Sequence, residues 1–130
     1  MIRALIPPDM DGAPEALGAS PGILSGSHVF LTGMTGSRAD GSMPSDIDTQ
    51  GHNAMAKIGR ILAEVDLTHA AIIEMTTYHI DIQSHFEAFN QVRRSYVSDP
   101  FPAWTAVEVA ALRRPGALVE IRVIAALAPS

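Results

Sequence analysis

The chain of 130 residues contains no cysteine and a single tryptophan. Without cysteine, disulfides, thiolate catalysis and cysteine-ligated metals are excluded. Basic residues are also few, because nine Lys and Arg stand against 14 Asp and Glu and give a formal net charge of −5. Nucleic-acid-binding proteins usually carry a basic face, so this composition argues against a nucleic-acid partner.

Long apolar runs are missing as well. No run approaches the roughly 20 residues that span a bilayer. The N-terminal apolar segment, residues 1–8, has too short an apolar core for a signal peptide. We therefore expect a cytoplasmic protein with no membrane partner.

The composition that remains is that of a compact fold. Hydrophobic residues make up 47% of the chain and charged residues 18%, which excludes intrinsic disorder. The length suits one domain with a core of its own, and no repeat or domain boundary is visible. We predict a single domain over residues 1–130.

Hydrophobic periodicity places the elements along the chain. Residues 7–22 are rich in Pro, Gly, Ala and Ser and predict a loop or extended arm. The segments 29–32 and 70–80 have strand character. Ser45 or Asp46 caps a first helix and Asp81 a second, which Asp99–Pro102 ends. The apolar stripes of the two helices are Ala54, Ile58, Ile61, Leu62 and Val65, and Phe86, Phe89, Val92 and Tyr96.

The C-terminal third predicts a β-hairpin. Residues 102–112 form its first strand, a tight connection follows at 113–117, and 118–125 return as the second strand. In this register Glu108 lies opposite Arg122 and forms a cross-strand ion pair. Glu120 then lies opposite Ala110, as an acid without a charge partner in an otherwise apolar strand.

The two faces of this predicted hairpin differ. One face is uniformly apolar and should lie under the two helices. It comprises Val107, Val109, Ala111, Val119, Ile121, Val123 and Ala125. The other face mixes apolar and charged groups. It comprises Trp104, Ala106, Glu108, Ala110, Glu120, Arg122 and Ile124. Since too few helices remain to cover the mixed face, we expect it to be buried against other subunits.

Together these features resemble the RidA (YjgF/YER057c/UK114) family. The resemblance covers roughly residues 18–127. It is carried by the element order, by Leu31-Thr32-Gly33, by Phe89-Asn90, by Pro102-Ala103 with Thr105, and by the run from Arg114 to Ile121. It implies an α+β, chorismate-mutase-like fold, a mixed β-sheet with two helices packed on one face. It also implies a homotrimer with a central β-barrel, in which small-molecule ligands bind in clefts between subunits. Family members with the full motif hydrolyse enamines and imines to ammonia and a keto acid.

Several positions depart from the family pattern. Trp104 stands where the family has an arginine that binds the substrate carboxylate. Ala19 replaces a tyrosine, Met34 a glutamine and Ala106 a cysteine, whereas Glu120 and Asn90 match. An indole cannot form the bidentate contact of a guanidinium. The usual amino-acid-derived imine therefore looks like a poor ligand, and an apolar or aromatic substrate is favoured.

Each candidate residue also has a structural interpretation. Glu120 either activates water for hydrolysis of a C=N bond or forms a buried structural ion pair, with Arg122 or with an arginine of a neighbouring subunit. Trp104 either lines an apolar pocket or fills it. Gly33 either offers its N–H to a ligand or permits close backbone approach. Asn90 either caps a loop or reaches the cleft. Ala19 and Ala106 complete the predicted substrate-binding set through the resemblance.

Three functions follow from these observations. The favoured one is a divergent enamine or imine deaminase-type hydrolase with Glu120 as the catalytic residue. The alternative is a non-catalytic trimer of the same fold that binds a small ligand or acts as a scaffold. A ribonuclease activity, which has been attached to the family, is weakened by the acidic composition.

No metal or other cofactor is predicted. The five histidines contain no His-Glu-x-x-His pair, and His79 and His85 fall on different elements. Residues 33–36 lack the lysine and Ser/Thr of a phosphate loop.

Overall fold

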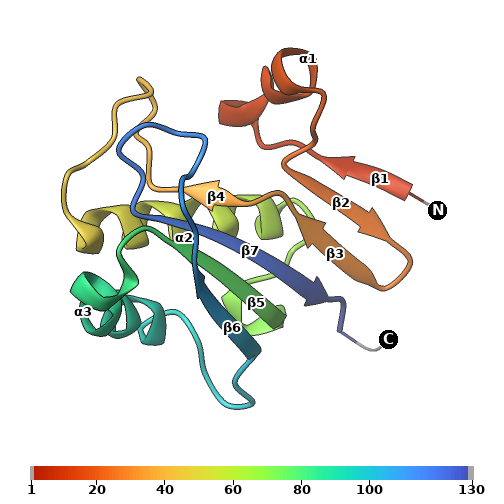
Figure 1. The fold of residues 1–130 in the computed structure, drawn as a ribbon. Coiled ribbons are helices and arrows are strands. Elements are labelled where there is room, and N and C mark those ends of the chain that lie inside the picture. The colour runs from red at the N-terminus through yellow and green to blue at the C-terminus, as the bar shows by residue number, and fades with distance from the viewer. Residues whose placement is uncertain (1, 129–130) are drawn as a thin grey trace.

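A computed structural model describes residues 2–128 (Figure 1). Its strands are β1 (Ile2–Leu5), β2 (Gly22–Ser25), β3 (His28–Leu31), β4 (Met34–Thr35), β5 (Ile72–His79), β6 (Ala103–Glu108) and β7 (Val119–Ala126). Its helices are α1 (Ala13–Leu17), α2 (Ile47–Ala63) and α3 (Ile82–Arg94), with 3-10 turns η1 (Pro8–Met10) and η2 (His69–Ala71). None of these helices is long and apolar enough to cross a membrane.

The strands form one mixed, seven-stranded sheet in the order β1-β2-β3-β7-β5-β6, and β4 also pairs with β7. β7 runs antiparallel to β3, β4 and β5, whereas β5 and β6 are parallel. The chain therefore crosses over through α3 between β5 and β6, as parallel neighbours require. Both α2 and α3 lie along one face of the sheet (Figure 1).

The helix α2 forms as its sequence predicts. Asp46 is the N-cap, and its carboxylate accepts hydrogen bonds from the Thr49 backbone N–H at 2.9 Å and from its hydroxyl at 2.7 Å. The predicted stripe is buried against the sheet at Ala54, Ile58, Ile61 and Leu62. Val65 lies beyond the end of the helix but packs against the same core.

The helix α3 begins where predicted but is capped differently. Asp81 occupies the N-cap position in a left-handed conformation, and its side chain accepts no backbone N–H of the helix. Instead, Glu108 at the end of β6 accepts the Ile82 N–H at 2.9 Å. A residue distant in sequence therefore satisfies one of the free amides of the first turn.

The predicted hairpin of residues 102–112 and 118–125 is wrong. β5 lies between the two strands, so β6 pairs with β5 and not with β7. The predicted Glu108–Arg122 pair is wrong for the same reason, because Glu108 lies opposite His79 and Arg122 opposite Thr76. Local proximity favours a hairpin, but the α3 crossover places β6 at the sheet edge beside the strand that precedes it.

The predicted faces are correct for β7 and inverted for β6. Val119, Ile121, Val123 and Ala125 are buried under the helices, as expected. On β6, however, Trp104 faces the helices and Val107 is 38% exposed on the opposite face. Trp104 and Glu120 therefore do not share a face within one chain.

The face of the sheet opposite α2 and α3 retains a partly apolar surface. Phe30 pairs with Ile124, Tyr78 pairs with both Glu120 and Val107, and the Phe30 side chain is 39% exposed. Such a surface, on strands that pair through the middle of the sheet, fits the expected association of subunits.

The N-terminal arm holds more structure than predicted. Residues 7–22 include η1 and α1, and Pro8 and Pro14 occupy first-turn positions, where the missing N–H of proline removes no helical hydrogen bond. The strands β1 and β2 flank this segment and extend the sheet beyond the predicted strand at 29–32.

Candidate active site

A pocket of about 440 Å³ lies between the N-terminal segment, the β3–β4 region and α2. Three of the predicted site residues, Ala19, Gly33 and Glu120, line it. The structure thus brings together residues from three separate parts of the chain. Trp104, Ala106 and Asn90 do not line this pocket.

Glu120 lies on the central strand β7, opposite Thr35 of β4 on one side and Tyr78 of β5 on the other. Its side chain packs directly against the backbone of Gly33. A Cβ atom added at position 33 would come within 2.9 Å of both Cγ and Cδ of Glu120. Gly33 therefore permits a close approach that holds this carboxyl group at the pocket wall.

The Glu120 carboxylate forms no ion pair with any residue that the structure describes. A buried pair with Arg122, one form of the structural alternative, is therefore absent among residues 2–128. A half-buried carboxylate that lines a pocket and has no cationic partner is available to a ligand or to water.

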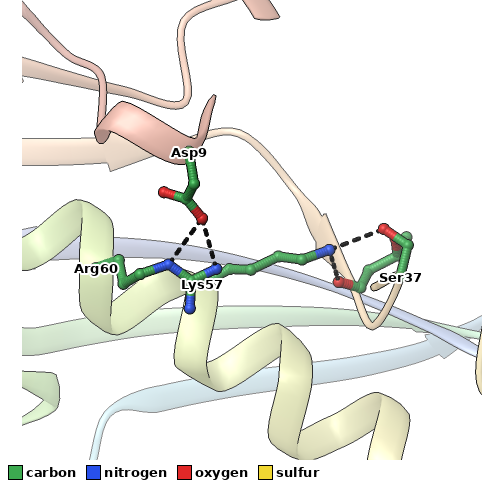
Figure 2. A network of polar contacts seen from close by, with 5 residues as sticks. Asp9, Ser37, Lys57 and Arg60 are labelled. Atoms are coloured by element: carbon green, nitrogen blue, oxygen red, sulfur yellow. Dashed lines mark hydrogen bonds and ion pairs between the residues drawn. The ribbon is translucent and has the colours of Figure 1, made fainter. Parts of the chain in front are cut away.

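The pocket lining is strongly cationic. Its charged residues are Asp9, Arg38, Lys57, Arg60, Arg113, Arg114 and Glu120. Only one of these cations is paired within the described chain, since Arg60 contacts Asp9 at 3.0 Å (Figure 2). Positive charge concentrated in a concave site attracts anionic ligands.

Lys57 is held in a fixed position at one side of the pocket. Its Nζ donates to the Thr35 carbonyl at 2.7 Å and to the Ser37 hydroxyl at 2.9 Å, and Figure 2 shows its side chain extended toward Ser37. Burial, together with the charges of Arg114 and Arg60, lowers the pKa of Lys57 to about 8. Sequence reasoning missed this residue, because a lysine on the polar side of a helix gives no signal by itself.

Trp104 belongs to a second group of residues on the helix side of the sheet. Its indole stacks on the Phe86 ring with centroids 5.5 Å apart and planes inclined by 5°. Its Nε1 donates to the Thr77 hydroxyl at 2.9 Å. The indole is therefore fixed by an aromatic stack on one ring face and a hydrogen bond at its edge.

Asn90 and Arg93 of α3 complete this second group. Asn90 accepts a hydrogen bond from Arg93 Nε at 3.2 Å, and the guanidinium carbon of Arg93 lies 3.6 Å from the Trp104 ring centroid. Ala106 follows Trp104 on the same face of β6, beside Thr77. The predicted site residues are thus divided into two groups, one around Glu120 and one around Trp104.

A pair of histidines supports the second group. His79 Nδ1 lies 3.3 Å from His85 Nε2, and its Nε2 lies 2.7 Å from the Thr77 hydroxyl that also accepts the Trp104 N–H. Burial lowers the pKa of His79 to about 4 and also lowers the pKa of His85. Both rings are therefore neutral near pH 7. The six-residue spacing concealed this contact, because the turn between β5 and α3 brings the rings together.

Comparison with known proteins places the chain in a family. The model described as Endoribonuclease L-PSP matches residues 10–127, so the chain belongs to this family, which includes the RidA (YjgF/YER057c/UK114) proteins. A structure of Rv2704 from Mycobacterium tuberculosis, described as a member of the YjgF/YER057c/UK114 family, superposes with a TM-score of 0.84 at 28% identity. The match covers 98% of this chain and 100% of that one.

Two curated relatives are similar over most of their length. The RutC family protein YjgH of Escherichia coli is 37% identical over 107 residues, which are 82% of this chain and 80% of the relative. The 2-iminobutanoate/2-iminopropanoate deaminase of Capra hircus is 32% identical over 120 residues, which are 90% of this chain and 86% of the relative. The predicted family and fold class are confirmed.

Proposed function

We propose that the protein hydrolyses the C=N bond of small imines or enamines, with Glu120 as the catalytic residue. The observation that carries this proposal is the position of the Glu120 carboxylate, which packs against Gly33, lines the 440 Å³ pocket and has no ion-pair partner among residues 2–128. Relatives named as imine deaminases support the reaction class.

The reaction needs one group that takes up a proton and returns it. The substrate enters as the protonated imine. Glu120 accepts a proton from water while the water oxygen attacks the imine carbon, giving a neutral carbinolamine. The carboxyl group then donates that proton to nitrogen. As the C–N bond breaks, ammonia leaves and the Glu120 carboxylate takes up the hydroxyl proton, which it passes to solvent, so that a carbonyl compound remains. An imine and water are thereby converted to a ketone or keto acid and ammonia, with no redox change.

We further propose that the active form is a homotrimer with sites in the clefts between chains. Two features support this assembly: the partly apolar sheet face around Phe30 and Val107, and the edge position of β6. The assembly brings the Trp104 group of one chain to the Glu120 pocket of another. Light scattering coupled to size exclusion measures the mass, and a monomer would contradict the proposal.

The Trp104–Phe86 stack favours a substrate with an apolar or aromatic portion. Phe86 covers one face of the Trp104 indole and the Arg93 guanidinium the other, so the stacked rings offer their edges to the apolar part of a ligand. In this arrangement Glu120 performs the chemistry and the aromatic stack selects the side chain of the imine.

The direct test uses imines made in the assay by an amino-acid oxidase. Semicarbazide traps the imine, so a hydrolase lowers the rate of semicarbazone formation. We expect wild-type protein to accelerate imine loss and Glu120→Gln to lose about 10²- to 10⁴-fold of that acceleration, as expected for a general base. Glu87→Gln, an exposed change on α3, is the matched control.

If Glu120→Gln hydrolyses every tested imine as fast as wild type, Glu120 is not the catalytic residue. If wild-type protein accelerates none of them, the protein is not an imine hydrolase, and a ligand-binding or scaffold role of the same fold takes its place.

A further inference from the structure

Arg93 is a buried cation without a counter-ion among residues 2–128. Its side chain is only 8% exposed, and the one ion pair among residues 2–128 joins Arg60 to Asp9. Removing a charge from water is costly unless a partner compensates, so buried charges are normally paired. Burial lowers the pKa of Arg93, but an arginine keeps its charge throughout the physiological range. The position therefore has a positive charge that nothing in the described chain neutralises.

The guanidinium is held in one orientation. Nε donates to Asn90 at 3.2 Å, and the guanidinium carbon lies 3.6 Å from the Trp104 ring centroid, which is a cation–π contact. Trp104 is itself fixed by the Phe86 stack and by its hydrogen bond to Thr77. Arg93 thus sits on a rigid support.

The two terminal nitrogens of Arg93 form no hydrogen bond within residues 2–128. Within the described chain the hydrogen bond of this side chain is made by Nε, and no polar side-chain atom is buried there without a partner. Nη1 and Nη2 therefore reach the surface of the chain. Two adjacent N–H donors on a fixed guanidinium match the two oxygens of a carboxylate.

We propose that Arg93 binds the carboxylate of the imine substrate through these two nitrogens, while the Trp104–Phe86 stack contacts the apolar part of the same molecule. This inference rests on the proposed function and assigns the residue that binds the carboxylate of its substrate, a 2-imino acid with an apolar side chain. It revises the expectation that such imines bind poorly, which considered position 104 alone.

The cationic lining around Glu120 agrees with an anionic substrate. In the proposed trimer, Arg93 and Trp104 of one chain face the Glu120 pocket of another. The carboxylate then lies at Arg93 and the C=N carbon at Glu120. Arg93 is a binding residue in this scheme, and it takes no part in the proton transfers.

The test measures binding without turnover. The probe is 2-oxobutanoate, a keto acid of the product class, with butanone as the matched ligand that lacks a carboxylate. Both are titrated into trimeric Glu120→Gln protein, so that no chemistry contributes. We expect Arg93→Gln to weaken 2-oxobutanoate binding about 10- to 100-fold, as loss of a bidentate charge-assisted contact implies. Butanone binding should not change.

Arg94→Gln is the control, since the neighbouring Arg94 is exposed and its substitution changes the net charge equally. Trp104→Leu is a second test variant, which keeps the guanidinium but removes the aromatic ring that supports it. We expect Trp104→Leu to weaken the binding of 2-oxobutanoate less than Arg93→Gln does. Thermal unfolding and the trimer mass establish that each variant is folded and assembled.

Equal keto-acid affinity of Arg93→Gln and Arg94→Gln would overturn the inference, as would absence of binding to the parent protein. Loss of the trimer in Arg93→Gln would also overturn the inference. That result would mean that Arg93 pairs with a carboxylate of a second copy of the chain and not with the carboxylate of a substrate. These outcomes are independent of the hydrolysis assay, in which only the Glu120 comparison decides the proposed function.

Discussion

Gly33→Ala should displace the Glu120 carboxylate, the proposed catalytic group, while leaving the fold in place. The new Cβ would lie within 2.9 Å of Glu120 Cγ and Cδ. Carbon atoms prefer separations of about 3.5–4.0 Å, so the Glu120 side chain must move by about 1 Å. Its carboxyl end is flexible and half-buried, which makes its movement easier than a shift of the β7 backbone.

The expected magnitudes differ between activity and stability. A displacement of about 1 Å in a catalytic group costs on the order of 100-fold in rate. Overpacking a core costs about 1–3 kcal/mol, and we expect the lower end here because a flexible side chain absorbs the contact. The imine-trapping assay measures kcat/KM, and thermal unfolding measures stability.

The pocket offers a matched control for this change. Gly12 also lines it, but a Cβ at position 12 would meet no atom within 4 Å. Gly12→Ala should therefore keep wild-type kcat/KM. Wild-type activity in Gly33→Ala would refute the argument that this glycine sets the position of Glu120.

Two further predictions concern stability. Burial lowers the pKa of His79 to about 4, from about 6.5 in the unfolded chain. The contribution of the neutral ring to the free energy of unfolding is therefore complete above about pH 6.5 and is lost as the pH falls toward 4. The loss is about 3 kcal/mol at most, and His79→Gln, but not the exposed His28→Gln, should flatten this part of the stability–pH curve. Glu108→Ala should cost about 1 kcal/mol by removing the acceptor for the Ile82 N–H at the start of α3, whereas Glu87→Ala, an exposed change within α3, should cost little; equal denaturant midpoints for the two would contradict this.

The sequence predicted the parts of the fold that depend on local chemistry. Asp46 provides both the cap and the start of α2, and the 3.6-residue periodicity then identifies which side chains are buried. On β7, the alternation of Val119, Ile121 and Val123 is sufficient to identify the buried face.

Where prediction failed, the deciding interactions join distant residues. The segments 102–112 and 118–125 have all the local features of a hairpin, but pairing of β6 with β5 depends on α3 packing against the sheet. That error inverted the face assigned to Trp104 and created a false partner for Glu108. A helix N-terminus that is capped by a residue of a distant strand, as Glu108 caps α3, leaves no signal in the sequence around the helix.

For the candidate site, the resemblance identified Glu120 and Gly33, and the structure places them in contact. Lys57 and Arg93 could not be predicted, because their environment arises only when helices pack on the sheet. Arg93 in particular is adjacent to Arg94 in an unremarkable polar stretch, and burial alone distinguishes the two.

The position of β7 has a consequence for synthesis. This strand is the last element of the described chain, yet it is hydrogen-bonded to β3, β4 and β5 and holds the sheet together. While residues 119–126 are still in the ribosome tunnel, the halves of the sheet cannot join, and the buried faces of β3 and β5 have no neighbour between them. The carboxylate of Glu120, the proposed catalytic group, arrives with this strand, so a nascent chain acquires its complete sheet and this carboxylate in a single event.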